Sequence, residues 1–295
     1  ENLAMSYPGV QKTYAIQAIL CEMKKLRQHS LIVDYTNGFL PNQLEETTQA
    51  ILHPAQHVVR NNPLPINPFL PQTSDTGGIK FVETANNIAK RITGLFDSVY
   101  AIGDQQYACL HQVIMNGVER WGTEMDLEKM LAMLEELMES KESKSPALSL
   151  SNKLRPFVLD RPFASGPDSY DWDQLFSTPD SLCNIFQLYG MDMHSCRLIT
   201  EFVLWDLYGF LQARGVKTDP KVIVLDEVQN LDHGEDSPLS KYLREGRKFG
   251  IALMLATQSM SSMKADERDR MFLAGHKLFF RPSDTEMKNF AKILG

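Results

Sequence analysis

The feature that most constrains this sequence is a series of short, almost wholly apolar segments that alternate with helix-like ones. Strands are predicted at residues 31–37, 184–190, 221–227, 251–258 and 276–283. Strands of continuous apolar character are buried on both faces, and helices between them favour parallel pairing. With 43% hydrophobic residues, the chain has enough apolar material for such a core. We therefore expect an α/β fold with a mainly parallel sheet flanked by helices.

The other segments divide the chain into three parts. Helical spacing of apolar residues predicts helices at residues 14–28, 79–97, 104–120, 125–139 and 194–213. Proline, serine and aspartate predict a loop or extended segment at 54–71, a linker at 140–152 and a surface loop at 160–180. We interpret residues 79–180 as a helical insertion with flexible loops, because strand-like segments are missing there. The two parts of the sheet domain are then residues 1–78 and 181–295.

The segment SYPGVQKT stands directly before the first predicted helix. A phosphate-binding loop needs small residues, so that backbone N–H groups wrap the phosphates. It also needs a Lys for the outer phosphates and a Ser or Thr for Mg²⁺. Lys12 and Thr13 fit the pattern G-x-x-x-x-G-K-S/T, with Gly9 as a central glycine. Ser6 and Gln11 replace its two fixed glycines, so this segment alone fits a phosphate loop or an ordinary Pro-Gly turn.

Two acids, Asp226 and Glu227, end the strongest predicted strand, KVIVLDE. In P-loop NTPases, the Asp that ends the strand beside the phosphate loop holds Mg²⁺, and a following Glu polarises the attacking water. Another strand ends in Gln258, and glutamines position this water in other NTPases. The carboxyl ends of parallel strands form the edge where α/β sheets bind ligands. The alternative is a buried strand capped by a solvated acidic loop.

A charged helix end, LREGRKFG at residues 243–250, lies between these two strands. One interpretation is a solvated helix end whose basic residues complement the helix dipole. The other is that Arg247 is an arginine finger, which acts on the nucleotide of a neighbouring subunit.

The acidic balance of the chain limits how it can contact nucleic acid. There are 37 Asp and Glu against 30 Lys and Arg, which gives a net charge of −7. Any contact with DNA must come from a local basic patch or from loops gathered by oligomerisation.

The sequence also indicates where such a chain resides. Its four cysteines are scattered and lack the spacing of a zinc site or a disulfide framework. No apolar run reaches the roughly 18 to 20 residues of a membrane helix, and no signal peptide is visible. We therefore expect a reducing, cytoplasmic location and no membrane partner. Because the chain begins without Met and almost inside a motif, we interpret it as a fragment of a longer protein.

Several of these motifs together resemble the HerA/FtsK group of P-loop ATPases, which are ring-forming motors that pump DNA. The resemblance rests on the Asp226–Glu227 pair, the block REGRKFGI, the ending Ala-Thr-Gln of the following strand, and LIVDYTNGF, which is similar to the second strand of that group. It covers residues 1–40 and about 184–283. The overall arrangement further resembles the ATPases of DNA phosphorothioation-dependent restriction systems (DptH or DndH).

The resemblance implies a RecA/FtsK-like P-loop fold and a role for each matching residue. Lys12 and Thr13 would match the phosphate and Mg²⁺ residues, and Asp226 would match the Mg²⁺ acid. Glu227 would match the catalytic base and Gln258 the sensor. The trans-acting finger would be Arg247, with Arg244 as a substitute. The residues implied to contact the nucleotide are those of the loop and of the first helical turn, namely Ser6, Gly9, Val10, Gln11, Lys12, Thr13 and Tyr14.

The implied function is an ATP-hydrolysing, Mg²⁺-dependent motor subunit that acts on DNA. Its expected partners are DNA, further copies of the chain in a hexameric ring, and other restriction-system proteins. Two alternatives stay open. Because Ser6 and Gln11 replace glycines, the domain could instead be a nucleotide-insensitive scaffold or switch in a restriction complex. The other alternative is a protein-pumping motor, such as a secretion or conjugation ATPase of the same superfamily.

Overall fold

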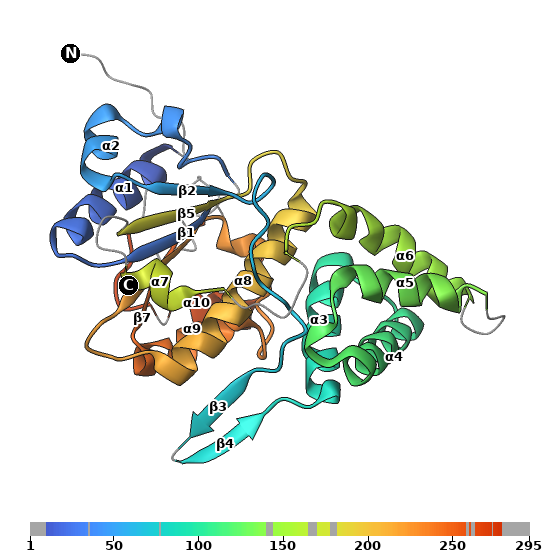
Figure 1. Cartoon of the computed structure of the whole chain (residues 1–295). Helices are drawn as coiled ribbons and strands as arrows, with labels where there is room; N and C mark the ends of the chain where they lie inside the picture. Colours follow the sequence, from blue (N-terminus) through green and yellow to red (C-terminus); the bar gives the residue numbers. More distant parts are fainter. Residues whose placement is uncertain are drawn as a thin grey trace.

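Four of the predicted strands, together with one strand that was not predicted, pair into a five-stranded sheet (Figure 1). The structure is a computed structural model, and it describes residues 10–34, 36–76, 78–139, 144–164, 170–177, 182–257, 260, 263–272 and 274–278. Every neighbouring pair in the sheet is parallel, so all five carboxyl ends lie at one edge. The strand order is β2 (Ala55–Val58), β5 (Cys183–Gln187), β1 (Ser30–Asp34), β6 (Lys221–Leu225) and β7 (Ile251–Leu255).

Alternate side chains of β1 enter two separate apolar clusters, one on each face of the sheet. Ile32 belongs to the smaller cluster, which packs under helices α1 (Val10–Lys25) and α2 (Glu46–Leu52). Leu31 and Val33 belong to the larger cluster on the opposite face. The helices that cover this second face are α7 (Trp172–Ser177), α8 (Met193–Arg214) and α9 (Pro238–Glu245). The sheet is therefore covered on both faces, as its continuous apolar strands predict.

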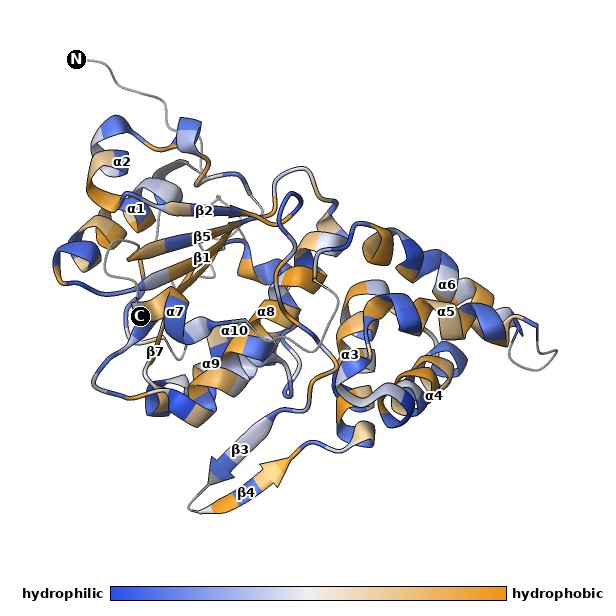
Figure 2. Ribbon diagram, viewed as in Figure 1, coloured by the Kyte–Doolittle hydropathy of each residue, from blue (hydrophilic) through white to orange (hydrophobic). Residues whose placement is uncertain are grey.

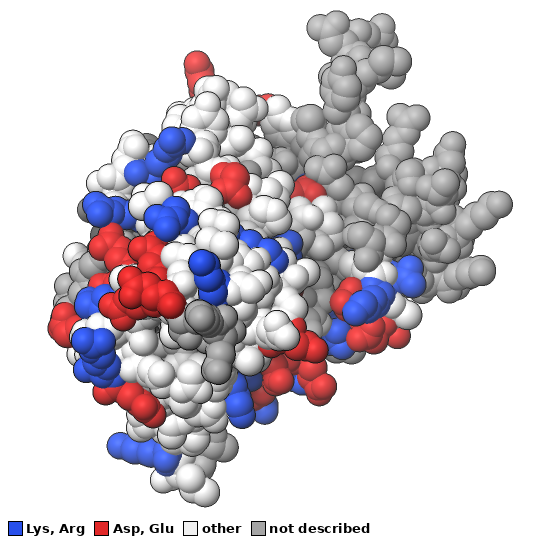
Figure 3. Space-filling model, turned by 90° about the vertical axis from the view of Figure 1, so that its right-hand side faces the viewer, with Lys and Arg blue, Asp and Glu red and all other residues white. Residues whose placement is uncertain are grey.

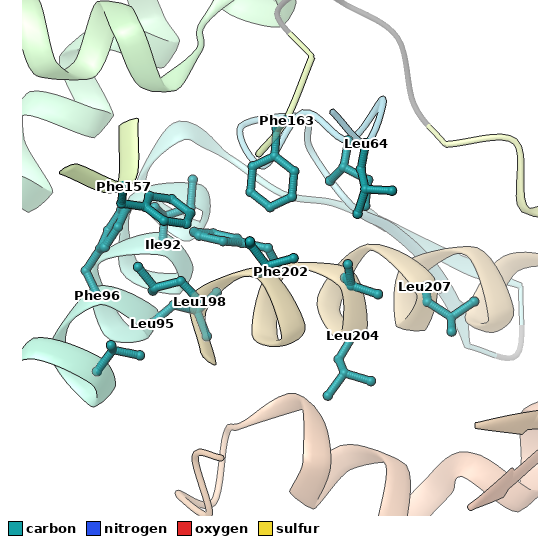
Figure 4. Packing of buried hydrophobic residues seen from close by; sticks show 14 of the residues in the cluster. Leu64, Ile92, Leu95, Phe96, Phe157, Phe163, Leu198, Phe202, Leu204 and Leu207 are labelled. Atoms are coloured by element: carbon teal, nitrogen blue, oxygen red, sulfur yellow. The ribbon is translucent and has the colours of Figure 1, made fainter. Parts of the chain in front are cut away.

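A group of helices lies beside the sheet domain and shares its larger core. Phe202 of α8 meets Phe96, Phe157 and Phe163, with ring centroids 5.8, 6.3 and 5.6 Å away (Figure 4). The helices of this group are α3 (Ala85–Tyr100), α4 (Asp104–Trp121), α5 (Leu127–Leu137) and α6 (Lys144–Leu159). The predicted helices at 104–120, 125–139 and 194–213 are confirmed. The limits of the insertion, residues 79–180, remain a prediction.

The helix predicted over residues 79–97 is wrong at its start. Residues 79–82 form β4 (Ile79–Val82), which pairs antiparallel with β3 (Thr73–Thr76) in a separate hairpin. The helix begins later because Thr84 caps its N-terminus by accepting a hydrogen bond from the backbone N–H of Asn87. The run Ile-Lys-Phe-Val after two glycines is a hairpin signal. Its apolar side chains are exposed, although the strand is largely hydrophobic (Figure 2).

The linker predicted over residues 140–152 is also wrong from residue 144 onwards, where helix α6 begins. Its apolar residues Ala147, Leu150 and Leu154 recur at helical spacing and are all fully buried. The serines and lysines between them gave the segment the composition of a loop. Tertiary packing of this one face outweighs that composition.

Two predicted loops contain regular structure. The segment 160–180 includes helix α7, whose Trp172 is buried and donates to Asp206 Oδ2 over 2.7 Å. The Pro-rich segment 54–71 includes the edge strand β2, which was missed because it is short and only half-buried. Of the strand predicted at 276–283, residues 276–278 have no regular structure, and the rest lies outside the described residues.

The remaining elements are short. They are the 3₁₀ turns η1 (Pro41–Gln43), η2 (Gly122–Glu124), η3 (Val228–Asn230) and η4 (Gly246–Phe249), and the helix α10 (Ala265–Met271). Within the part of the chain that the structure describes, none of the helices combines the length and the apolar character needed to cross a bilayer.

Candidate functional site: a lysine held by two acids at the sheet edge

The carboxyl edge of the sheet brings together residues from the two ends of the sequence. Lys12 lies in the first turn of α1, and Asp226 and Glu227 directly follow β6. Lys12 Nζ lies 2.6 Å from Asp226 Oδ1 and 2.5 Å from Glu227 Oε1. The lysine of the predicted phosphate loop and the acids of the predicted Mg²⁺ and catalytic positions therefore form one cluster.

Burial makes this cluster dependent on its own pairing. The exposed fraction is 8% for Lys12, 4% for Asp226 and 7% for Glu227. A buried charge is tolerated only when it is paired and hydrogen-bonded, because desolvation otherwise costs several kcal/mol. One lysine here faces two carboxylates, so the cluster carries a formal charge of −1. An additional cation would complete the neutralisation.

The backbone at Glu227 is held in an uncommon conformation. Its φ is +51°, in the left-handed region that non-glycine residues rarely adopt. The backbone N–H of Glu227 donates to Asp226 Oδ1 over 2.8 Å, which fixes the turn after β6. A left-handed non-glycine residue costs roughly 1–2 kcal/mol, and such strain gathers at functional sites.

The carboxylate of Glu227 is oriented by side chains that the sequence did not single out. Gln229 Nε2 donates to Glu227 Oε2 over 2.5 Å, and Thr257 Oγ1 donates to Gln229 Oε1 over 2.6 Å. Thr257 follows β7, so this chain of hydrogen bonds links the ends of two adjacent strands. Thr257 belongs to the Ala-Thr-Gln motif that ends the strand, so the sequence could have indicated it, whereas Gln229 belongs to no motif.

A third acid, Asp34, ends the neighbouring strand β1 and is fully buried. Asp34 Oδ2 accepts from the backbone N–H of Phe39 over 3.0 Å and from Gln187 Nε2 over 2.9 Å. Thr36 Oγ1 lies 3.2 Å from Asp34 Oδ1 and 3.2 Å from Asp226 Oδ2. The sequence indicated that this strand ends in an acid, but it did not indicate the link through Thr36.

Several predicted site residues fall outside this cluster. Tyr14 is 46% exposed on α1. Ser6, Gly9 and Gln258 lie outside the described residues, and of Val10 and Gln11 only the helical backbone of α1 is described. The binding and sensor roles expected at these positions remain predictions.

Arg247 lies far from the acids within the same chain. It is an exposed residue of η4, which only Gly250 separates from the first residue of β7, whereas the site lies at the other end of that strand. A five-residue strand spans about 13 Å between its end residues. Arg244 is engaged locally, since its Nη2 donates to the backbone carbonyl of Glu235 over 2.9 Å. Any action of Arg247 on such a site requires a second copy of the chain.

A buried acid lies behind the loop that follows the site. Glu201 of α8 is fully buried, and its Oε1 accepts from the backbone N–H of Asp232 over 2.7 Å. Burial raises the pKa of Glu201 to about 8, with the hydrogen bond from Asp232 opposing that rise. The side chain is therefore protonated near neutral pH, and it ties the loop after Glu227 to helix α8.

Comparisons with known proteins agree with this geometry at the level of the fold. No family model and no curated protein matches the chain. Among solved structures, VirB4 of Thermoanaerobacter pseudethanolicus superposes with a TM-score of 0.71. The chain is similar in fold to VirB4. The match covers 98% of this chain and 79% of the VirB4 chain, at 13% sequence identity, so the likeness to VirB4 concerns the fold alone.

A weaker match is the plasmid coupling protein TrwB in complex with the ATP analogue ADPNP. Its TM-score is 0.46 at 14% identity, and the match covers 90% of this chain and 74% of TrwB. The assignment of the fold rests on VirB4. The expected α/β fold, with its mainly parallel sheet flanked by helices, is confirmed.

Proposed function

We propose that this chain is a P-loop ATPase that binds and hydrolyses ATP with Mg²⁺. The observation that carries the proposal is the contact of Lys12 with both Asp226 and Glu227. In nucleotide hydrolysis a lysine binds the phosphates beside an acid for Mg²⁺ and an acid for the attacking water, so this contact supports the proposal. The fold supports it as well, because the two acids follow a strand at the carboxyl edge of a parallel sheet, the edge where α/β sheets bind ligands.

The residues of the site fit Mg²⁺ bound together with a nucleotide. Mg²⁺ prefers oxygen ligands and is held by one or two carboxylates plus substrate phosphates. Thr13 and Asp226 offer such oxygens. Within the described ranges, His, Cys, Asp and Glu nowhere gather in threes as a metal site, so a cage made of protein alone is not the expected form. When bound, Mg²⁺ would neutralise charge on the phosphates.

The residues then take distinct roles. Lys12 would exchange its two carboxylate partners for phosphate oxygens, with Val10, Gln11 and Tyr14 beside the nucleotide. Once released from Lys12, the carboxylate of Glu227 would act as base toward the attacking water, still oriented by Gln229. Ser6 and Gly9 would complete the loop, and Gln258 would contact the γ-phosphate or the water.

Nucleotide binding is the first experiment, because it needs only one subunit. Thermal unfolding with and without Mg-ATP should show an upward shift, since ligand at 100 times its Kd adds about 2.7 kcal/mol. Lys12→Ala should abolish the shift. Lys25→Ala, an exposed lysine on the same helix, is the matched control and should keep it. The absence of any shift at millimolar Mg-ATP would reject the proposal for this chain.

Hydrolysis is tested separately at Glu227. Glu227→Gln should remove ATP turnover while Mg-ATP binding persists, because it removes the base and keeps the shape. Glu119→Gln changes an exposed acid on α4 and should leave turnover unchanged. Unaltered turnover in Glu227→Gln would contradict the catalytic role.

We further propose that the ATPase acts on DNA as a ring, most specifically in a phosphorothioation-dependent restriction system. Lys/Arg and Asp/Glu are interspersed on the face shown in Figure 3, so DNA contacts would come from loops gathered in a ring. Arg247→Ala should lower turnover of the oligomer and spare binding, with Lys248→Ala as control. Turnover that DNA does not stimulate would favour a protein-pumping motor instead.

A second candidate function is that of a nucleotide-insensitive scaffold or switch. It is favoured by the replacement of two loop glycines by Ser6 and Gln11, and by the pairing of Lys12 within the chain itself. Gln11→Gly separates the candidates. A large gain in Mg-ATP affinity would indicate a compromised native loop, and an unchanged affinity would indicate that Gln11 is tolerated.

A further inference from the structure

Thr36 joins two carboxylates that come from adjacent strands. Its hydroxyl lies 3.2 Å from Asp34 Oδ1, at the end of β1, and 3.2 Å from Asp226 Oδ2, after β6. A hydroxyl has a single proton and ionised carboxylates only accept, so the proton is shared between the two acids. Thr36 is thus the contact that limits rotation of Asp226 on the Oδ2 side.

The other partner of Thr36 is immobilised. Asp34 is fully buried and accepts from the backbone N–H groups of Thr36 and Phe39 and from Gln187 Nε2. These contacts come from the loop after β1 and from β5. A carboxylate held by hydrogen bonds from two elements has a fixed position. Because Thr36 contacts both Asp34 and Asp226, it fixes Asp226 relative to Asp34.

The same loop also touches the first turn of helix α1. A methyl group added to Gly38 would lie 3.2 Å from Thr13 Cγ2 and 3.5 Å from Thr36 Oγ1. The absence of a side chain at Gly38 therefore lets Thr13 and Thr36 flank the same point of the backbone. Thr13 and Asp226, the two proposed oxygen ligands of Mg²⁺, are both positioned against residues 36–39.

We propose that Thr36 is a positioning residue that sets the orientation of Asp226 for Mg²⁺. It acts through Asp226 and does not touch the ion or the nucleotide. Asp226 Oδ1 is fixed by Lys12 and by the backbone N–H of Glu227, while Oδ2 is fixed by Thr36. When Lys12 leaves for the phosphates, the contact with Thr36 remains, together with the backbone N–H of Glu227. This inference rests on the proposed ATPase function.

The Mg²⁺ dependence of nucleotide binding tests the inference. Thermal shifts with ATP are measured over a range of Mg²⁺ concentrations. Thr36→Val keeps the shape and removes the hydroxyl, and it should raise the Mg²⁺ concentration at half-maximal shift by about 10- to 100-fold, the usual effect of losing a partner of a metal ligand. Thr36→Ser should restore the wild-type midpoint. Thr47→Val, an exposed threonine on α2, should not change it.

An unchanged midpoint in Thr36→Val, or an equal loss in Thr36→Ser, would overturn the inference. If Thr36→Val does not fold, Thr36→Ala replaces it in the same titration. A wild-type chain that shows no shift with Mg-ATP would instead reject the proposed function.

A second measurement needs no nucleotide and keeps the two failures distinguishable. The melting temperatures of Thr36→Val, Asp226→Ala and the double variant are compared in the absence of ligand. If Thr36 acts on Asp226, the loss caused by Thr36→Val should be at least halved when Asp226 is already alanine. Losses that simply add would show that Thr36 serves only the loop after β1, and they would overturn the inference.

Discussion

The sheet domain and the helical group beside it bury different kinds of side chain. All five of the buried Lys, Asp and Glu residues among those described lie in the sheet domain, namely Lys12, Asp34, Glu201, Asp226 and Glu227. Among the described residues, helices α3 to α6 bury two polar residues, Thr93 and Ser151, and the rest of their buried side chains are aliphatic or aromatic. The difference indicates that the packing of the helices and the charged residues of the candidate site can be altered separately, although the two regions share one core.

The largest expected effect breaks the packing where the two regions meet. Phe202→Ala removes the ring that contacts Phe96, Phe157 and Phe163, and it should cost about 3–5 kcal/mol in the free energy of unfolding, measured with urea. The molecules that remain folded should keep the wild-type affinity for Mg-ATP. Leu159→Ala, at a position that is 66% exposed, should change the free energy by less than about 0.5 kcal/mol. A loss below 1 kcal/mol in Phe202→Ala would mean that the two regions do not depend on this joint.

Removal of the buried cation should show the reverse balance. Lys12→Met removes the cation that neutralises Asp226 and Glu227, and it should cost about 1–3 kcal/mol in the absence of ligand while abolishing Mg-ATP binding. Adding Glu227→Gln should recover part of the stability, because one of the two buried negative charges is then gone. If Lys12→Met is as stable as wild type, pairing with Lys12 does not stabilise the two buried acids in the folded chain.

The buried acid Glu201 should make the stability of the sheet domain depend on pH. Its pKa is raised from 4.5 to about 8 in the folded state, so the folded chain holds a proton that the unfolded chain has lost. Stability should therefore fall as the pH rises from 4.5 to 8, by about 1.4 kcal/mol per pH unit within that window. Between pH 6 and 8, Asp206, whose pKa is raised to about 6, contributes equally to the slope of wild type and of a Glu201 variant, so the difference between the two urea-unfolding slopes reports Glu201.

Glu201→Gln should flatten this slope, because the amide still accepts from Asp232 and carries no titratable proton. The matched variant Glu119→Gln, at an exposed site, should keep it. An equal slope in wild type and Glu201→Gln would show that Glu201 is ionised in the folded chain.

The smallest expected effect concerns the close approach at Gly38. Gly38→Ala places a methyl group 3.2 Å from Thr13 Cγ2, so Thr13 must move by a few tenths of an ångström. We expect Mg-ATP affinity to fall by less than about tenfold, or 1.4 kcal/mol. Gly94→Ala on α3 meets nothing within 4 Å and should instead stabilise its helix by about 0.5–1 kcal/mol without altering binding. Equal Mg-ATP affinities in Gly38→Ala and Gly94→Ala would show that the close approach at Gly38 does not affect nucleotide binding.

The sheet was largely predictable because its strands are continuous apolar runs. β2, β3 and β4 were missed because each has only four residues, and the side chains of β2 and β4 are not buried, so these strands lack the continuous apolar run of a buried strand. The meeting of Lys12 with Asp226 and Glu227 could be predicted, because each residue lies next to a helix start or a strand end that is visible in the sequence. Thr36 and Gln229 could not, since their partners depend on how the strand ends meet in the fold.

The left-handed backbone at Glu227 has a consequence for how this sequence can change. Glycine or asparagine would relax that backbone, so the substitutions that most easily gain stability at this position are those that discard the carboxylate. Under the proposed function, stability and hydrolysis would therefore favour different residues at this one position. The glutamate in this strained conformation indicates that the carboxylate matters more at this position than the stability its replacement would add.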